Sequence, residues 1–98
     1  MTEVRFSVRA QRDVAKCWSY WAERASEKAA GAVTAEVGRG VRVLARQPTA
    51  GRSAGKYGKG IRVLRAERFL MYYRRSAGKV VVVRVISGER EQEKAWGS

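Results

Sequence analysis

The sequence contains no histidine, only one cysteine and only one proline among its 98 residues. Without histidine, the commonest general base of enzymes that work near neutral pH is missing. The single cysteine, Cys17, cannot form a disulfide within the chain, which is typical of proteins kept in a reducing cytosol. We therefore expect a cytoplasmic protein that folds without a disulfide, a metal or a cofactor.

Long apolar runs are also missing. The run Val80–Val83 is far shorter than the roughly 20 residues that a membrane-spanning helix needs. The N-terminal residues alternate between polar and apolar types, so they lack the apolar segment of a secretion signal. The length is enough for one hydrophobic core. These features predict a single domain over residues 1–98 that does not enter a membrane.

Acidic side chains are scarce, and their distribution is uneven. Lysine and arginine total 21 against nine aspartates and glutamates, which gives a net charge of +12. Residues 39–88 contain thirteen basic side chains and one acidic one, whereas residues 1–38 contain six and five. Fifteen of the basic residues are arginines, which suit two-point binding of phosphate and carboxylate groups. A charge of this size favours association with nucleic acid or with an acidic protein.

The spacing of apolar residues predicts a strand followed by two helices. Residues 4–6 alternate as in a short strand, and Ser7 is placed to cap a helix that we expect over 8–25. A second helix should begin near Ser26 and end before Pro48. Its apolar stripe is Ala30, Val33, Val37, Val41 and Leu44. Glycines within it either allow a close approach or let the helix fray.

Three further strands are expected after a basic, glycine-rich loop at residues 48–60. They span residues 61–65, 69–74 and 80–87, and their connections are short enough for hairpins, so they predict an antiparallel meander. The last strand is apolar on nearly both faces, as in a central strand. With strict alternation, one face would hold Val81, Val83 and Val85, and the other Val80, Val82, Arg84 and Ile86.

Together these elements predict an α+β fold. A short N-terminal strand and an antiparallel helical hairpin should pack on a small antiparallel sheet that ends in the three-stranded meander. The helices should cover one face of this sheet, leaving the other face open and ringed with arginine. For residues 91–98, a short helix and a flexible tail are both compatible with the sequence.

Four segments stand in a characteristic order along the chain. They are Ser7–Val14 (S-x-x-A-x-x-D-V), Leu44–Arg52 (L-x-x-x-P-x-x-G-R), Gly60–Arg62 followed by Arg68–Arg74 (GIR and RFLMYYR), and Val83–Arg90 (VRVI-x-G-x-R). Each is weak alone, but their order and spacing resemble the ParE/RelE toxins of bacterial type II toxin–antitoxin pairs. The resemblance covers residues 4–91.

This resemblance implies a toxin with one of two activities. RelE-like members are ribosome-dependent mRNA endonucleases, whereas ParE-like members are similar to proteins that poison DNA gyrase. Both are neutralised by an antitoxin whose disordered acidic segment wraps the toxin, and a strongly basic chain suits such a partner. We therefore expect a hetero-oligomer with an acidic, ParD-like antitoxin. DNA gyrase is the expected target, and the ribosome with its message is the alternative.

The residues of the nuclease branch are only partly matched. Arg62, Arg65 and Arg90 correspond to its cations, but the position of a further sheet arginine falls at Leu70. The C-terminal proton-transfer position falls at Trp96, whose indole cannot transfer a proton near neutral pH. The ParE-like function, without catalysis, is therefore favoured. A basic nucleic-acid-binding module without toxicity remains a third hypothesis.

Candidate contact residues follow from charge and position. Because Tyr72 and Tyr73 alternate, one should face the helices and the other the open face. A charge inside a central strand, as at Arg84, is costly unless it is paired or lies at that open face. The expected contacts to a target or to phosphate are Arg52, Lys56, Lys59, Arg62, Tyr72, Arg84 and Arg90. The expected contacts to the antitoxin are Arg39, Arg42, Arg46, Tyr73 and Arg74.

Overall fold

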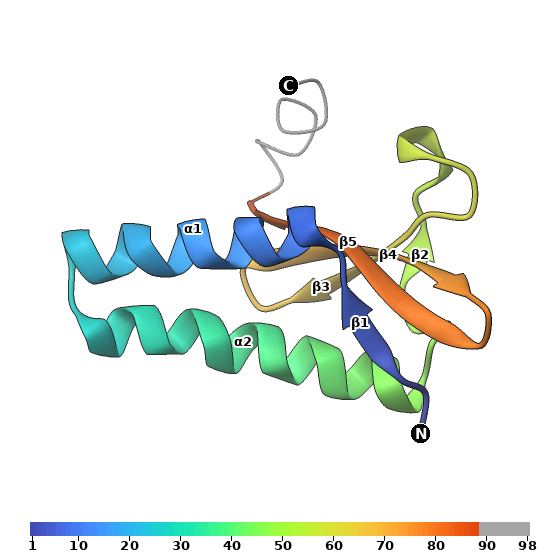
Figure 1. Ribbon diagram of the computed structural model, residues 1–98, viewed down its shortest axis with the longest axis horizontal. Coiled ribbons are helices and arrows are strands. Elements are labelled where there is room, and N and C mark those ends of the chain that lie inside the picture. The colour runs from blue at the N-terminus through green and yellow to red at the C-terminus, as the bar shows by residue number, and fades with distance from the viewer. Residues whose placement is uncertain (89–98) are drawn as a thin grey trace.

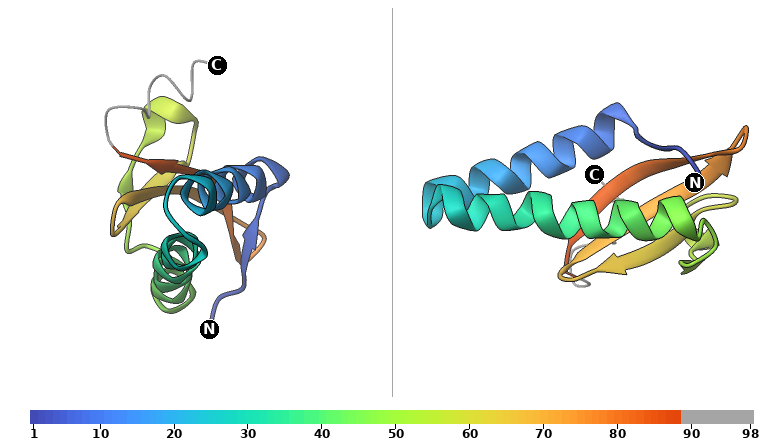
Figure 2. Two further views of the ribbon diagram at one scale, coloured as in Figure 1. Left: turned by 90° about the vertical axis from the view of Figure 1, so that its left-hand side faces the viewer. Right: turned by 90° about the horizontal axis from the view of Figure 1, so that it is seen from below.

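The computed structural model describes residues 1–88 (Figure 1). The elements in chain order are β1 (Val4–Phe6), α1 (Val8–Arg24), α2 (Glu27–Arg46), β2 (Arg52–Ser53), the 3-10 turn η1 (Gly55–Tyr57), β3 (Arg62–Ala66), β4 (Phe69–Ser76) and β5 (Lys79–Ser87). The two helices form an antiparallel hairpin on one face of the sheet (Figure 2), which confirms the predicted α+β class. No helix within this part of the chain is long and apolar enough to cross a membrane. The expectation for residues 91–98 lies outside the described residues.

The five strands form one mixed sheet in the order β1-β5-β4-β3-β2. Strands β3, β4 and β5 form the predicted antiparallel meander, and β2 pairs antiparallel with β3. Strand β1 runs parallel to β5 with Val4 opposite Val80. The helical hairpin supplies the long crossover that a parallel pair requires. The two-residue strand β2 lies in the segment that was expected to be entirely loop. It is too short to leave a hydrophobic pattern.

Strand β5 contains a bulge. On β4, the neighbours Tyr72 and Tyr73 lie opposite Arg84 and Val82, so Val83 is an extra residue in β5. The bulge reverses the alternation of side chains along the strand. As a result, the core beneath the helices receives Val80, Val82 and Val85. The expectation of strict alternation is therefore wrong, because nothing in a run of valines marks the bulge.

Both faces of the sheet carry a hydrophobic cluster. The cluster beneath the helices contains Tyr73, and the cluster on the opposite face contains Tyr72, so the two tyrosines face opposite sides as predicted. We call the face opposite the helices the far face. Its cluster is Ala54, Ile61, Val63, Leu70, Tyr72 and Ile86. The loop between β2 and β3 packs on this cluster, with the Tyr57 ring edge-on to Tyr72 at 5.3 Å between centroids.

Both helices begin at the predicted caps. The Ser7 hydroxyl accepts from the Ala10 amide at 3.1 Å, and the Ser26 hydroxyl accepts from the Ala29 amide at 3.0 Å. Helix α2 continues without a break through Gly40, where a Cβ atom would overlap the sulfur of Met71. Glycine at position 40 therefore allows α2 to pack closely against Met71 of β4, and it does not cause the helix to fray.

Candidate functional site

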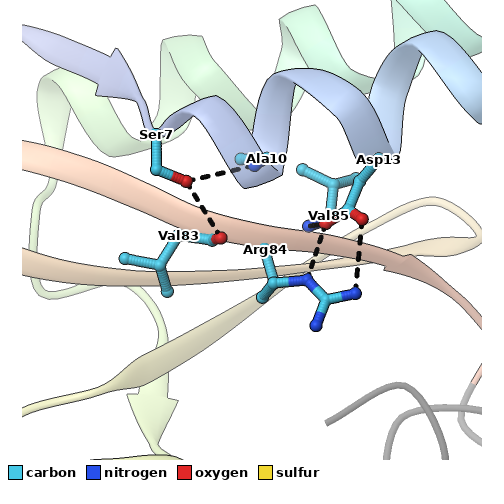
Figure 3. A network of polar contacts seen from close by, with 6 residues as sticks. All are labelled: Ser7, Ala10, Asp13, Val83, Arg84 and Val85. Carbon is cyan, nitrogen blue, oxygen red and sulfur yellow. Dashed lines mark hydrogen bonds and ion pairs between the residues drawn. The ribbon is translucent and has the colours of Figure 1, made fainter. Parts of the chain in front are cut away.

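Helix α1 is fixed to the edge of β5 by side-chain hydrogen bonds (Figure 3). Strand β1 pairs with β5 only as far as Val82. Beyond that point the Ser7 hydroxyl donates to the Val83 carbonyl at 3.1 Å, and the Asp13 carboxylate accepts from the Val85 amide at 2.9 Å. These bonds replace the missing strand neighbour and satisfy backbone groups that would otherwise be exposed at a sheet edge.

The same carboxylate pairs with Arg84. The Arg84 Nε atom lies 2.9 Å from Asp13 Oδ2, and its Nη2 atom lies 3.3 Å from Oδ1 (Figure 3). The side chains of Arg84 and Asp13 are only 11% and 14% exposed. A paired arginine explains how a charge is tolerated in this strand. The pair thus positions α1 against the sheet, and the contact of Arg84 with a target stays a prediction.

The connection from α2 to β2 is organised by Tyr73 and Arg62. The Tyr73 hydroxyl donates to the Pro48 carbonyl at 2.8 Å and accepts from the Gly51 amide at 2.9 Å. Arg62 donates to the carbonyl oxygens of Thr49, at 3.1 Å, and of Gly51. The half-buried Arg62 therefore holds this turn in place, a role that sequence reasoning missed.

Both predicted tyrosine contacts need correction. Tyr72 and Tyr73 are each 0% exposed, because one packs beneath the loop of the far face and the other beneath the helices. A ring without exposed surface cannot meet a base or an antitoxin side chain. Their contribution is to the core and to the loop that it supports.

Cations from four adjacent strands gather on the far face. The strand registers place Arg52 of β2, Arg65 of β3, Arg74 of β4 and Lys79 of β5 on this side of the sheet. The three arginines are exposed, and Lys79 is half-buried. The strands of the described structure contain neither aspartate nor glutamate. We call these four residues the sheet cations.

The loop between β2 and β3 adds further positive charge beside them. A cavity of about 340 Å³ lies under this loop and is lined in part by Arg52, Lys56 and Tyr57. The Lys56 amine lies 5.0 Å from the centre of the Tyr57 ring, and Lys59 is exposed in the same loop. Of the predicted candidates, Arg52 and Lys56 thus line one cavity and Lys59 is exposed in the same loop, whereas Arg90 lies outside the described residues.

The opposite side of the molecule carries an apolar groove between α1 and α2. The groove has a volume of about 570 Å³, and its lining includes Ala15, Trp18, Val37 and Val41. Trp18 is 39% exposed here. An uncharged stripe along α1, at helical spacing, could have revealed this surface: Val8, Gln11, Ala15, Trp18 and Ser19.

The arginines of α2 differ in their surroundings. Arg39 forms an ion pair with Glu67 in the β3–β4 turn, at 3.3 Å, so part of its charge is matched within the chain. Arg42 and Arg46 are exposed on the same helix, and the Arg42 guanidinium lies next to Gly38, which lines the apolar groove. Of the predicted antitoxin contacts on α2, Arg42 therefore has the best position beside a groove.

A second ion pair ties the same turn to both helices. The Arg68 guanidinium lies 3.0 Å from the Glu36 carboxylate on α2 and 4.8 Å from the centre of the Trp21 ring on α1. At the other end of the sheet, a hydrogen bond from Arg5 holds the pKa of Glu3 below its ordinary value. The Lys79 amine also acts on the Glu3 carboxylate through its charge. Among the ion pairs within residues 1–88, none involves Arg52 or Arg74.

The chain was compared with known families and structures. The family model described as the ParE toxin of the type II toxin–antitoxin system, parDE, matches residues 4–92. A solved structure described as the chromosomal ParDE toxin–antitoxin system from P. aeruginosa matches with a TM-score of 0.75 and 20% sequence identity, covering 91% of this chain and 98% of that one. No curated protein sequence matches. The structural match shows a shared fold, and the family match confirms the resemblance found in the four segments. The chain belongs to the ParE toxin family of type II toxin–antitoxin systems.

Proposed function

We propose that this chain inhibits DNA gyrase and is held inactive by an acidic antitoxin, with which it forms a hetero-oligomer. Membership of the ParE toxin family supports a toxin. The choice of gyrase over message cleavage depends mainly on Leu70, which stands where the nuclease branch carries an arginine. Leu70 is 2% exposed within the cluster of the far face, so this position offers neither charge nor surface to a phosphate.

Two further observations support a function without catalysis. Attack by a ribose 2′-hydroxyl requires a base and an acid beside the phosphate, and the sequence has no histidine to serve as either. Arg62, a candidate cation for that reaction, donates to the carbonyl oxygens of Thr49 and Gly51. These two hydrogen bonds account for the position of the Arg62 side chain, so a catalytic role is not needed to explain it.

We place a segment of the antitoxin in the groove between α1 and α2. Protein interfaces have an apolar centre and a polar rim, and this groove offers an apolar floor with Trp18 partly exposed beside it. Arg42 at the margin suits an acidic side chain of the partner. A segment that folds as it binds could cover such a groove along its length.

The purified chain is expected to block supercoiling of relaxed plasmid by DNA gyrase, with half-inhibition near stoichiometric amounts of enzyme. Messages bound to ribosomes should remain uncut at the same concentration. Agarose gels of the plasmid and primer extension on the message measure the two activities. Normal supercoiling together with cut message would replace this proposal by the RelE-like endonuclease, and inactivity in both assays would remove the toxin function.

The substitution Ala15→Glu is expected to weaken antitoxin binding at least about tenfold, equivalent to about 1.4 kcal/mol. It places a negative charge in the apolar groove that we assign to an acidic partner. The acidic protein expected to be encoded beside this chain would be titrated by calorimetry. Ala32→Glu makes the same change at an exposed position of α2 that does not line the groove, and it should bind normally. Equal affinities of the two variants would exclude the groove.

A further inference from the structure

We infer that the far face of the sheet binds the phosphate backbone of double-stranded DNA directly, in the absence of gyrase. The sheet cations Arg52, Arg65, Arg74 and Lys79 would make the contacts. This inference goes beyond the proposed function, because it adds a nucleic-acid partner that the chain binds by itself. It is tested with DNA alone, so its outcome does not depend on gyrase inhibition.

The arrangement of the cations suits several phosphates at once. Neighbouring strands lie about 4.8 Å apart, so the four strands spread the cations over roughly 14 Å across the sheet. Their registers place them level with Leu70, Tyr72, Arg74 and Ser76 of β4, which spreads them over roughly 20 Å along the strands as well. The strands contribute no carboxylate to this face in the described structure. Lys56 and Lys59 extend the positive surface along the loop beside β2. Arginine can hold a phosphate through two parallel hydrogen bonds, which favours it at such positions.

The far face suits a nucleic acid better than a protein partner. A protein interface needs exposed apolar surface at its centre, whereas binding to a nucleic-acid backbone is driven mainly by charge. On the far face every member of the apolar cluster is itself buried, and the loop between β2 and β3 packs on it through Ala54 and Tyr57. The large apolar side chains exposed within residues 1–88 all lie outside the sheet, and they are Met1, Val8, Trp18, Tyr20 and Val43.

The same face suits a duplex better than a single strand. Proteins bind unpaired bases largely by stacking them on exposed aromatic rings. Tyr72 has no exposed surface, and the half-buried Tyr57 ring lies edge-on to it with the Lys56 amine above. Within residues 1–88, the large aromatic residues that are exposed, Trp18 and Tyr20, are on α1, away from this face. The described part of the far face therefore offers cations but no exposed aromatic ring. This suits a DNA duplex, whose bases are already stacked on one another inside the double helix.

The test is fluorescence anisotropy of a fluorescein-labelled 20-base-pair DNA duplex with the full-length chain over a range of NaCl concentrations. We expect a linear fall of log K with log salt. The triple variant Arg52→Gln/Arg65→Gln/Arg74→Gln should reduce the slope by about 0.9 for each phosphate that it no longer neutralises, roughly 2.7 in all. Each single variant should reduce it by about 0.9, which guards against a folding defect in the triple variant.

The matched control is Arg9→Gln/Arg12→Gln/Lys16→Gln, which removes the same net charge from exposed positions of α1. It should keep the slope of the unmodified chain. Equal reductions of the slope in the two triple variants would show attraction by net charge alone and would overturn the inference. Absence of duplex binding, or tighter binding of a single-stranded RNA of equal length, would also overturn it.

Discussion

Replacing Asp13 with alanine is expected to lower the free energy of unfolding by about 3–5 kcal/mol, the range for breaking a largely buried ion pair from one side. The Asp13 carboxylate accepts from both the Arg84 guanidinium and the Val85 amide. Without it, both donors would remain in a contact that is mostly shielded from water. Urea denaturation followed by circular dichroism measures the change. For a chain of this size, the melting temperature should fall by about 4–8 °C per kcal/mol.

Two variants separate the charge of Asp13 from its hydrogen bond. Asp13→Asn keeps an oxygen that can accept from the Val85 amide but removes the charge that pairs with Arg84, so the decrease in stability should be intermediate. In an Arg84→Met background, Asp13→Ala should cost less than in the natural chain, because no partner cation remains. A decrease below about 1 kcal/mol for Asp13→Ala alone would contradict the proposed role in fixing α1.

The substitution Gly51→Ala is expected to destabilise the fold by about 3 kcal/mol, at the upper end of the usual cost of overpacking. A Cβ atom at Gly51 would lie 2.6 Å from the Val63 carbonyl oxygen and 2.8 Å from the Tyr73 hydroxyl. The backbone of β3 cannot move away without disturbing its pairing with β2. The hydrogen bond from the Gly51 amide to Tyr73 would also be strained. Thermal and urea denaturation measure the decrease in stability.

Gly31→Ala provides the matched comparison. Gly31 is exposed in α2, and a Cβ atom there would have nothing within 4 Å. Alanine should therefore stabilise the helix, by up to about 1 kcal/mol. The two glycine substitutions are thus expected to change stability in opposite directions. Similar changes in both would mean that the close approach at Gly51 is not what requires glycine.

The proposed functions use two sides of the molecule that differ in chemistry. The groove between α1 and α2 is apolar and suits a protein segment, whereas the far face is cationic and its apolar cluster is covered. Charge removal on the sheet and obstruction of the groove can therefore be studied independently. If both proposals hold, Ala15→Glu should leave DNA binding unchanged, and Arg74→Gln should leave the groove intact.

Helices, caps and the meander could be predicted because they depend on local patterns. The hydroxyls of Ser7 and Ser26 cap nearby amides, and apolar residues at helical spacing mark the buried face of α2. The need for a partner at Arg84 also follows from the cost of burying a charge. The partner itself, Asp13, is separated from Arg84 by 71 positions, so no local pattern identifies it.

Local patterns in the sequence were therefore enough to predict an α+β chain, four short segments gave its resemblance to the ParE/RelE toxins, and composition showed that the positive charge is concentrated after residue 38. The folded chain was needed to show which of these charges are matched and which tyrosines are buried. The bulge at Val83, the parallel pairing of β1 and the covering of the far face likewise depend on contacts between distant segments. A side chain's exposure is set by what packs against it from elsewhere in the chain, and sequence spacing alone does not contain that information.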